Sequence, residues 1–357
     1  MAISGYLDEF YNNPTKKQRG RFKKFLAQQG LEYEDSVEMT LKVADEATGE
    51  MVGTGSIEGK VIKCMAIDSK RRGEGLSAHV LSVLVKEQFN RGRTHIFVFT
   101  SPKNIEETSG NVFVGFRIVT KTDDIVLLEM GTTNIDNYLE ELKFKTRGIQ
   151  ESVNGSIGAI IVNCNPFTLG HQFIIETAAS ECEFLYIFVV SEDRSLFPTN
   201  VRLKLVKSGT NHLSNVMVLE GGDYIISQAT FPRYFLKDCD DLALAQARLD
   251  VMIFGEYIAP TLGIDRRYVG EEPYCALTKS YNQAMKEILI PKGVELQIIP
   301  RKEIEGEVIS ASKVRTLIHE NKIYETMNLV PPSTYNFLIS KEAKSIIDKI
   351  RRNKTRN

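Results

Sequence analysis

The residues best suited to chemistry gather in one segment near the middle of the chain, residues 157–180. Its first part, residues 157–162, is a continuous apolar run that predicts a short buried strand. Residues 163–170 follow with the Asn, Pro and Gly types of a tight loop, and residues 171–180 are apolar enough to form the next helix. A strand, a glycine-bearing loop and a helix N-terminus together make an anion site, because free backbone amides and the helix dipole face an incoming phosphate.

The end of this loop, Thr168-Leu169-Gly170-His171, resembles the T/H-x-G-H motif of the nucleotidyltransferase superfamily. A histidine in the first helical turn can donate a hydrogen bond to charge growing on an α-phosphate, and Gly170 lets backbone approach the phosphates. Catalysis of this kind is positioning plus electrostatic stabilisation. The alternative is that His171 merely caps a helix. The resemblance implies catalytic roles for His171 and Thr168, and ATP contacts for Asn163, Asn165, Pro166, Phe167 and Gly170.

A second motif near the end of the chain, Ile309-Ser-Ala-Ser-Lys-Val-Arg315, resembles the I-S-x-S/T-x-x-R element of the same superfamily. Ser310 is a good helix N-cap, and Ser312 and Arg315 stand three residues apart on one face of the helix that follows. Hydroxyls and a guanidinium at a helix start suit the β- and γ-phosphates of a nucleoside triphosphate. The alternative is an ordinary capped helix with a solvated arginine. The two motifs together predict an ATP site, with Arg315 in a catalytic role and Ser310 and Ser312 in binding.

The elements that position these motifs are strands alternating with helices, which implies a parallel sheet. Apolar runs predict strands at residues 157–162, 184–190, 216–220, 250–255 and 295–300. A ligand in such a sheet lies outside the carboxyl ends of the strands, which is where both motifs fall.

Two further segments could add nucleotide contacts. The F-x-x-x-x-R pattern that ends at Arg202, with Lys204 beyond it, resembles the superfamily segment that brings basic residues to the phosphates; an exposed helix face explains it equally well. Gly270 and Glu271 lie in a Val-Gly-Glu-Glu-Pro segment that looks like a nucleotide-contacting turn in adenylyltransferases. Gly270 permits close backbone approach, and a carboxylate can hold a ribose hydroxyl or a metal-bound water.

The N-terminal part has a different pattern. Residues 1–30 read as a basic amphipathic opening with apolar side chains at helical spacing, and residues 38–47, 50–57 and 60–67 predict strands that lead into a glycine loop and a helix at 77–89. The loop resembles the R/Q-x-x-G-x-G/A loop of the GNAT acetyltransferases, whose amides grip the pyrophosphate of coenzyme A. This implies pantetheine-arm contacts for Arg72, Gly73, Gly75 and Asn104. Asn111 stands where that family usually has a tyrosine acid, so we expect thiol-arm binding without ordinary acetyl-CoA chemistry. A glycine loop that binds nothing is the alternative.

Composition bounds the remaining possibilities. A chain of 357 residues with 42% hydrophobic and 25% charged residues is typical of a globular protein of two or three domains. A net charge of -1 gives no footprint for nucleic acid, and the basic tail at 349–356 reads as a solvated helix end. No apolar run is long enough for a membrane span, and residues 1–30 lack a signal-peptide core. The five widely spaced cysteines suggest no metal site and favour a reducing cytoplasm; Cys164 is either a reactive thiol or, more in keeping with its type, a small buried filler.

A turn-rich segment at 148–156 divides the chain into a GNAT-like α+β domain, residues 1–147, and a Rossmann-like parallel-sheet nucleotidyltransferase domain with C-terminal helices, residues 148–357. This pairing closely resembles the citrate lyase ligase family over essentially the whole chain. The resemblance implies an acid–thiol ligase that converts ATP and acetate into acetyl-adenylate. The acetyl group would then pass to the phosphopantetheine-type thiol on the citrate lyase acyl carrier subunit, with Mg²⁺ accompanying the ATP and no part for nucleic acid or membrane. Alternatives are a nucleotidyltransferase of coenzyme biosynthesis fused to a separate acetyltransferase domain, and a non-catalytic regulator that binds a nucleotide and a CoA-like ligand.

Overall fold

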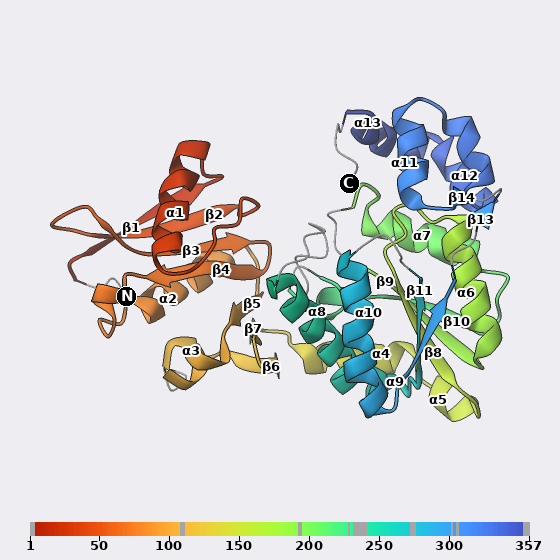
Figure 1. The fold of residues 1–357 in the computed structure, drawn as a ribbon, viewed down its shortest axis with the longest axis horizontal. Coiled ribbons are helices and arrows are strands. Elements are labelled where there is room, and N and C mark those ends of the chain that lie inside the picture. Colours follow the sequence, from red (N-terminus) through yellow and green to blue (C-terminus); the bar gives the residue numbers. More distant parts are fainter. Residues whose placement is uncertain are drawn as a thin grey trace. The chain divides into compact units, whose positions relative to one another are not determined.

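The computed structural model of the protein describes residues 4–107, 111–191, 195–227, 229–230, 241–271, 276–300, 303–304 and 307–352. Contacts divide the chain into two compact units, Met1–Tyr138 and Leu139–Asn357 (Figure 1). Each unit has its own sheet. The domain boundary after residue 147 suggested by the turn-rich segment stays a prediction.

The first unit is built on a seven-stranded sheet of order β1-β2-β3-β4-β5-β7-β6. All neighbours are antiparallel except β4 and β5, whose parallel ladder is limited to the pairs Val61–Phe97 and Ile62–Val98. The strands are β1 (Tyr6–Asn12), β2 (Met39–Asp45), β3 (Met51–Glu58), β4 (Val61–Ile67), β5 (His95–Thr100), β6 (Arg117–Lys121) and β7 (Val126–Gly131). The helices are α1 (Lys16–Gln28), α2 (Leu76–Asn90), α3 (Pro102–Glu107) and α4 (Ile135–Lys145), the last of which runs across the division between the units.

Helix α2 begins directly after the glycine loop and covers the middle of this sheet. Its buried residues Leu76, Val80 and Leu84 share one hydrophobic cluster with β2 to β5. Small residues on β3 make this approach possible, because a Cβ at Gly55 would come within 2.6 Å of the Leu84 side chain. The expected order of antiparallel strands, glycine loop and helix is therefore confirmed. One expectation is wrong: residues 6–12 form the edge strand β1 rather than part of an amphipathic helix.

The second unit contains a five-stranded parallel sheet of order β10-β9-β8-β11-β12. Its strands are β8 (Ile157–Val162), β9 (Phe184–Val189), β10 (Val216–Glu220), β11 (Arg266–Gly270) and β12 (Glu295–Ile299), and β13 (Glu303–Ile304) pairs with β14 (Glu307–Val308) separately. Strand order reverses beside β8, since β9 and β10 lie on one side and β11 and β12 on the other. Such a reversal marks the crevice where parallel sheets bind ligands, and the expected parallel-sheet class is confirmed.

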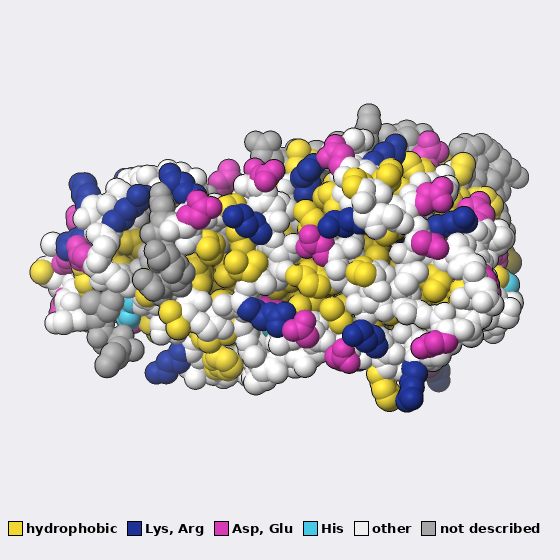
Figure 2. Space-filling view, turned by 90° about the horizontal axis from the view of Figure 1, so that it is seen from below, with side chains coloured by type: hydrophobic (Ala, Val, Ile, Leu, Met, Phe, Trp, Pro, Cys, Tyr) yellow, Lys and Arg dark blue, Asp and Glu magenta, His cyan; other side chains and the backbone are white. Residues whose placement is uncertain are grey.

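Helices surround this sheet and continue past it to the C-terminus (Figure 1). They are α5 (Ile149–Ser152), α6 (Leu169–Glu181), α7 (Thr199–Gly209), α8 (Asp241–Ile253), α9 (Ala259–Leu262), α10 (Ala276–Leu289), α11 (Ala311–His319), α12 (Pro332–Leu338) and α13 (Lys344–Arg352). Within the described ranges, no helix is long and apolar enough to cross a membrane. On the face drawn in Figure 2, Lys and Arg alternate with Asp and Glu among hydrophobic side chains, so neither sign of charge dominates there.

One predicted strand is wrong. Residues 250–255 lie in α8 and in the short π-helix Phe254–Ile258 that continues it, and the fourth strand of the sheet is Arg266–Gly270. Periodicity alone cannot distinguish a short apolar run in a strand from one in a buried helix. Arg266 and Arg267 made the real strand look polar, although Arg267 is buried in the fold.

Candidate active site

The start of α6 fixes both the position and the tautomer of His171. Thr168 is the N-cap, and its hydroxyl oxygen accepts the His171 amide at 3.3 Å. In return His171 Nδ1 accepts the Thr168 amide at 3.1 Å and lies 2.8 Å from the Thr168 hydroxyl. Because Nδ1 accepts from a backbone N–H, the neutral ring carries its proton on Nε2. Capping and catalysis are thus compatible, since the cap turns Nε2–H into an oriented hydrogen-bond donor.

Phe167 supports this histidine from within the core. The two rings stack with centroids 6.1 Å apart, and Phe167 is fully buried. Gly209 of α7 packs so closely on the phenyl ring that a Cβ there would come within 2.2 Å of it. Phe167 is therefore a buried packing platform for the His171 ring, and its part in ATP binding stays a prediction. Pro166 precedes it after a cis peptide bond.

The second motif reaches the first directly. Arg315 Nη1 donates to the main-chain carbonyl of Asn165 at 2.6 Å, and its Nη2 donates to the Ser312 hydroxyl at 3.1 Å. Burial lowers the pKa of the Arg315 guanidinium from its ordinary value, although it stays a cation. Ser310 caps α11 by accepting the Lys313 amide at 3.2 Å, as its sequence position suggested. The structure thus joins residues that are 150 positions apart in the chain.

Gly170 is required where the two motifs meet. A Cβ at this position would lie 2.9 Å from the carbonyl oxygen of Ile309. The backbone that approaches Gly170 is thus the protein's own, at the residue that leads into α11. The neighbouring Leu169 amide is used by the Leu329 carbonyl at 2.9 Å. Across the residues that the structure describes, no partner takes the Gly170 amide, which leaves one N–H at the helix start for an anion.

Arg202 is a buried brace for the loops of this site. Its side chain is inaccessible to solvent, and Nε donates to the Phe197 carbonyl at 2.9 Å. Nη1 donates to the carbonyls of Val190 at 2.6 Å and Asn163 at 3.0 Å, and also to the Asn163 side-chain oxygen at 3.0 Å. The guanidinium therefore ties the ends of β8 and β9 to the segment before α7. In this arrangement it holds the loop of Asn163 rather than presenting its charge at the surface.

The loop asparagines point inward as well. Asn165 Oδ1 accepts the Phe197 amide at 3.1 Å, and Asn163 Oδ1 accepts the Ser195 hydroxyl at 3.0 Å. Cys164 between them is fully buried, and burial raises the pKa of its thiol far above the ordinary value. A protonated, enclosed thiol matches the small buried filler expected from its type rather than a nucleophile.

The remaining nucleotide candidates lie at the carboxyl end of β11 and on α7. Gly270 ends β11 next to β8 and packs on Ile174 of α6, where a Cβ would meet that side chain at 2.8 Å. Glu271 follows it, exposed, with its amide bonded to the Ile299 carbonyl at 2.8 Å. Lys204 is exposed on α7, and its ammonium pairs with Glu342 at 3.0 Å. Glu272 and Pro273, the rest of that predicted turn, lie outside the described residues.

A buried polar network centred on Asp250 of α8 corresponds to none of the sequence motifs. Asp250 of α8 accepts the Ile226 amide at 2.7 Å, the Thr230 hydroxyl at 2.6 Å and the Tyr281 hydroxyl at 2.8 Å. Burial raises the pKa of the Asp250 carboxyl and lowers that of the neighbouring Arg267. Ile226 has a φ of 42°, a strained value for a β-branched residue, so Asp250 holds the segment after β10 in a fixed shape.

The glycine loop of the first unit has the backbone that its residue types demand. Gly73 and Gly75 have φ of 88° and 76°, and neither would bury a Cβ against another atom. Arg72 beside them is exposed. Asn104 donates to the Thr100 hydroxyl at 3.0 Å near the end of β5. Strands β4 and β5 are paired at two positions only. Beyond these they are no longer paired, at the C-terminal end of β4, from which the glycine loop departs. The Asn111 side chain is outside the described residues.

Known proteins match the chain in both regions. Residues 157–338 match the family described as the citrate lyase ligase C-terminal domain. A citrate (pro-3S)-lyase ligase from Klebsiella pneumoniae is 38% identical over 91% of this chain and 93% of its own length. The enzyme of that name from Escherichia coli K12 is 35% identical over 95% of each chain.

Solved structures resemble the first unit. An acyl-CoA N-acyltransferase from Pseudomonas aeruginosa aligns with 35% of this chain and 99% of its own, at 13% identity and a TM-score of 0.30. The ribosomal-protein-S18-alanine N-acetyltransferase from Escherichia coli aligns with 36% of this chain and 96% of its own, at 11% identity and a TM-score of 0.29.

Proposed function

The chain belongs to the citrate lyase ligase family, and from that premise we propose that it is an ATP-dependent acid–thiol ligase that activates acetate as acetyl-adenylate. The acetyl group then passes to the prosthetic-group thiol of the citrate lyase acyl carrier subunit. The observation that carries the proposal is the direct contact between Arg315 and the loop that ends in His171. This contact lies between α11, which carries Arg315, and the loop that leads into α6, so groups expected at opposite ends of a triphosphate come from two neighbouring elements.

The groups at the start of α6 and on the facing α11 fit ATP because they are hydrogen-bond donors, one of which is a cation. They comprise the Gly170 amide, the Nε2–H of His171, the Ser312 hydroxyl and the Arg315 guanidinium. The helix dipole adds to the positive potential. Such a set matches phosphate oxygens, and within the described ranges no carboxylate pairs with Arg315 to oppose it. Mg²⁺ would be bound as the ATP complex.

In the proposed first step an acetate oxygen attacks the α-phosphorus of ATP and pyrophosphate leaves. His171 donates its Nε2–H to the charge that grows on the α-phosphate, while Arg315 and Ser312 hold the leaving pyrophosphate. Thr168 keeps the imidazole in the required tautomer through Nδ1. In the second step the thiolate attacks the acetyl carbonyl, a carbon–sulfur bond forms, and AMP leaves. The adenylate is needed because a thiolate cannot displace the oxygen of a free carboxylate.

The GNAT-like unit is proposed to hold the phosphopantetheine-type arm. Its phosphate would meet the amides of the loop Arg72-Gly-Glu-Gly75, with Asn104 near the separating strands β4 and β5. On this assignment residues 1–147 serve the thiol and residues 148–357 serve ATP and acetate. We place the reaction in the cytoplasm, where ATP and reduced thiols are both available.

The deciding experiment is exchange of radioactive pyrophosphate into ATP, measured with and without acetate. We expect exchange that depends on acetate and is abolished by a chelator of Mg²⁺. Exchange of equal rate without any carboxylic acid, or ATP binding with no exchange, would refute the ligase.

Substitutions at two glycine positions can separate the two half-reactions. Gly75→Phe should block the phosphates of the thiol arm, so acetylation of the carrier fails while pyrophosphate exchange continues. Gly92→Phe is the matched control, because Gly92 also has a positive φ of 74° and open space around it but lies at the far end of α2. It imposes similar backbone strain without touching the loop. Parallel loss of both half-reactions in the Gly75 variant, or equal behaviour of the two variants, would count against the assignment.

A further inference from the structure

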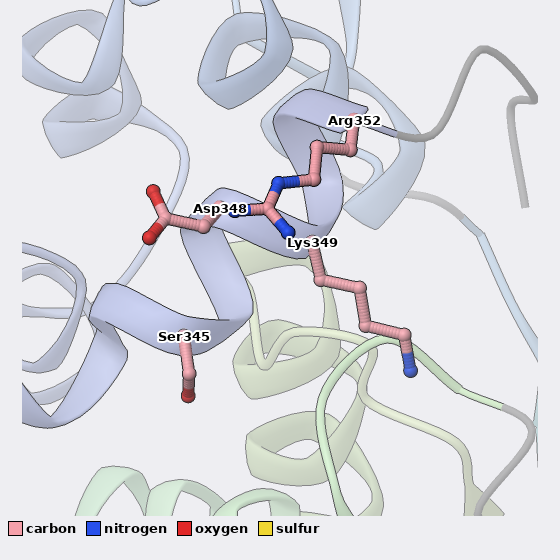
Figure 3. Close-up of a pocket in the computed structure, with 4 residues that line it drawn as sticks. All are labelled: Ser345, Asp348, Lys349 and Arg352. Carbon is pink, nitrogen blue, oxygen red and sulfur yellow. The ribbon is translucent and has the colours of Figure 1, made fainter.

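Helix α13 has two sharply different faces. Ile346, Ile347 and Ile350 are buried on one side. On the other, Ser345, Asp348, Lys349 and Arg352 follow one another at the i, i+3, i+4 and i+7 positions of a single helical face. These four side chains line a surface hollow of about 390 Å³ (Figure 3).

The exposed side of this helix is strongly basic. Lys344, Lys349, Arg351 and Arg352 are all exposed, and we call these four residues the basic α13 face. None of them forms an ion pair with any residue that the structure describes, whereas Lys204, Arg248 and Lys322 of the same unit are paired with glutamates. Asp348 is the one acidic residue of the helix.

The sequence shows the same concentration of charge. Residues 341–357 contain seven Lys or Arg and two Asp or Glu, although the whole chain contains 45 and 46 and has a net charge of -1. Residues 341–357 are therefore net positive, whereas the rest of the chain is net negative. Unpaired like charges that lie close together repel one another, and an anionic surface that covers them relieves this repulsion.

The basic α13 face is held rigidly beside the ATP site. The three isoleucines of α13 belong to the same hydrophobic cluster as Val314 and Ile318 of α11. His319 Nδ1, at the end of α11, donates to the Ile350 carbonyl at 3.2 Å. Helix α11 is the element that begins with Ser310 and carries Arg315. The charges thus stand on a helix packed directly against the one that holds the proposed triphosphate.

We propose that the basic α13 face docks an acidic surface of the protein that presents the acceptor thiol. The inference rests on the proposed function, which requires a protein-borne thiol to reach an adenylate bound beside α11. Four cations on one short helix suit a limited protein contact and the steering of an oppositely charged partner. A nucleic acid would require a longer basic track, and the chain as a whole carries no positive excess.

The test compares two charge-reversal variants of the full chain. K349E/R352E changes the basic α13 face, and K207E/K286E makes the same change in charge at exposed lysines of α7 and α10. The probe is the citrate lyase acyl carrier subunit with its thiol prosthetic group. We expect K349E/R352E to raise the KM for the carrier about tenfold at low salt, with kcat nearly unchanged and the effect weakening as salt is added. The control should keep the parent KM.

Acetate-dependent pyrophosphate exchange tests the proposed ligase activity independently of carrier docking. Both variants should retain exchange, because neither changes a group at the ATP site. Equal KM values in the two variants would overturn the docking proposal, and so would loss of exchange in K349E/R352E alone. Binding of the parent to a DNA duplex or to phosphatidylserine vesicles that K349E/R352E loses, with carrier KM unchanged, would overturn it as well. Absence of exchange in the parent would instead refute the ligase, and docking would then be decided by titrating the carrier into both variants.

Discussion

Replacing Gly170 with alanine tests whether the contact between the two motifs controls activity. The added methyl carbon would lie 2.9 Å from the Ile309 carbonyl oxygen and 3.5 Å from the Thr168 hydroxyl oxygen. Carbon–oxygen contacts this short do not persist, so the start of α6 and the residue before Ser310 must separate by about 0.5 Å to reach an ordinary contact. The motifs that bear His171 and Arg315 would move apart with them.

The expected effect on stability is small because two terms oppose one another. Alanine is favoured over glycine inside a helix by about 0.5–1 kcal/mol. Overpacking of a rigid site costs about 1–3 kcal/mol. The net result is a free energy of unfolding between roughly unchanged and about 2.5 kcal/mol lower. Catalysis should respond more strongly, because a misplacement of about 1 Å can cost a hundredfold in rate and half of that displacement suggests about tenfold.

The assay is acetate-dependent pyrophosphate exchange, with hydrogen exchange of α6 amides to report local stability. Gly20→Ala is the control, because Gly20 lies within α1 and its Cβ would meet no atom within 4 Å. That substitution should stabilise its helix by about 0.5–1 kcal/mol and leave activity at the parent level. A Gly170→Ala protein that is more stable than the parent and fully active would refute the reasoning, since the helix-propensity gain would then have met no steric opposition.

Four further outcomes follow from the same geometry. His171→Ala should keep the fold and reduce exchange about a hundredfold or more; unchanged turnover in the folded variant would remove His171 from the reaction. Arg315→Ala should raise the ATP requirement by a factor that corresponds to about 1.5–3 kcal/mol, and equal ATP affinity would contradict its placement. Arg202→Met should lower the free energy of unfolding by at least about 3 kcal/mol, because several buried carbonyls lose their donor; a neutral result in urea denaturation would disprove the brace. Burial raises the pKa of the Cys164 thiol, so it stays protonated at pH values where an ordinary thiol ionises; alkylation of Cys164 in the native protein, followed by peptide mapping, should not accelerate from pH 7 to 10, and modification at the rate of a free thiol would contradict this.

The sequence alone was informative wherever local chemistry carries the signal. Both motifs could be identified from residue types and spacing, and the structure confirms Ser310 as the helix cap that its type indicated. The parallel sheet followed from apolar runs separated by helical stretches. The strand at Arg266–Gly270 was missed because its two arginines hide the apolar pattern. Arg267 is nevertheless buried, with its guanidinium over the Phe254 ring, and a strand pattern does not reveal such a contact.

Tertiary structure alone decided what each site residue touches. Gly170 looked like a position for a ligand's phosphate, and in the fold it is needed for the carbonyl of Ile309, which lies far along the chain. Arg202 looked like an exposed phosphate contact or helix face, and packing encloses it among carbonyls from three separate segments. Cap, turn and apolar signals are written in neighbouring residues, because the forces that set them act over one or two turns of chain. Burial and cross-chain contact depend on which distant segments pack together, so a single stretch of sequence cannot fix them.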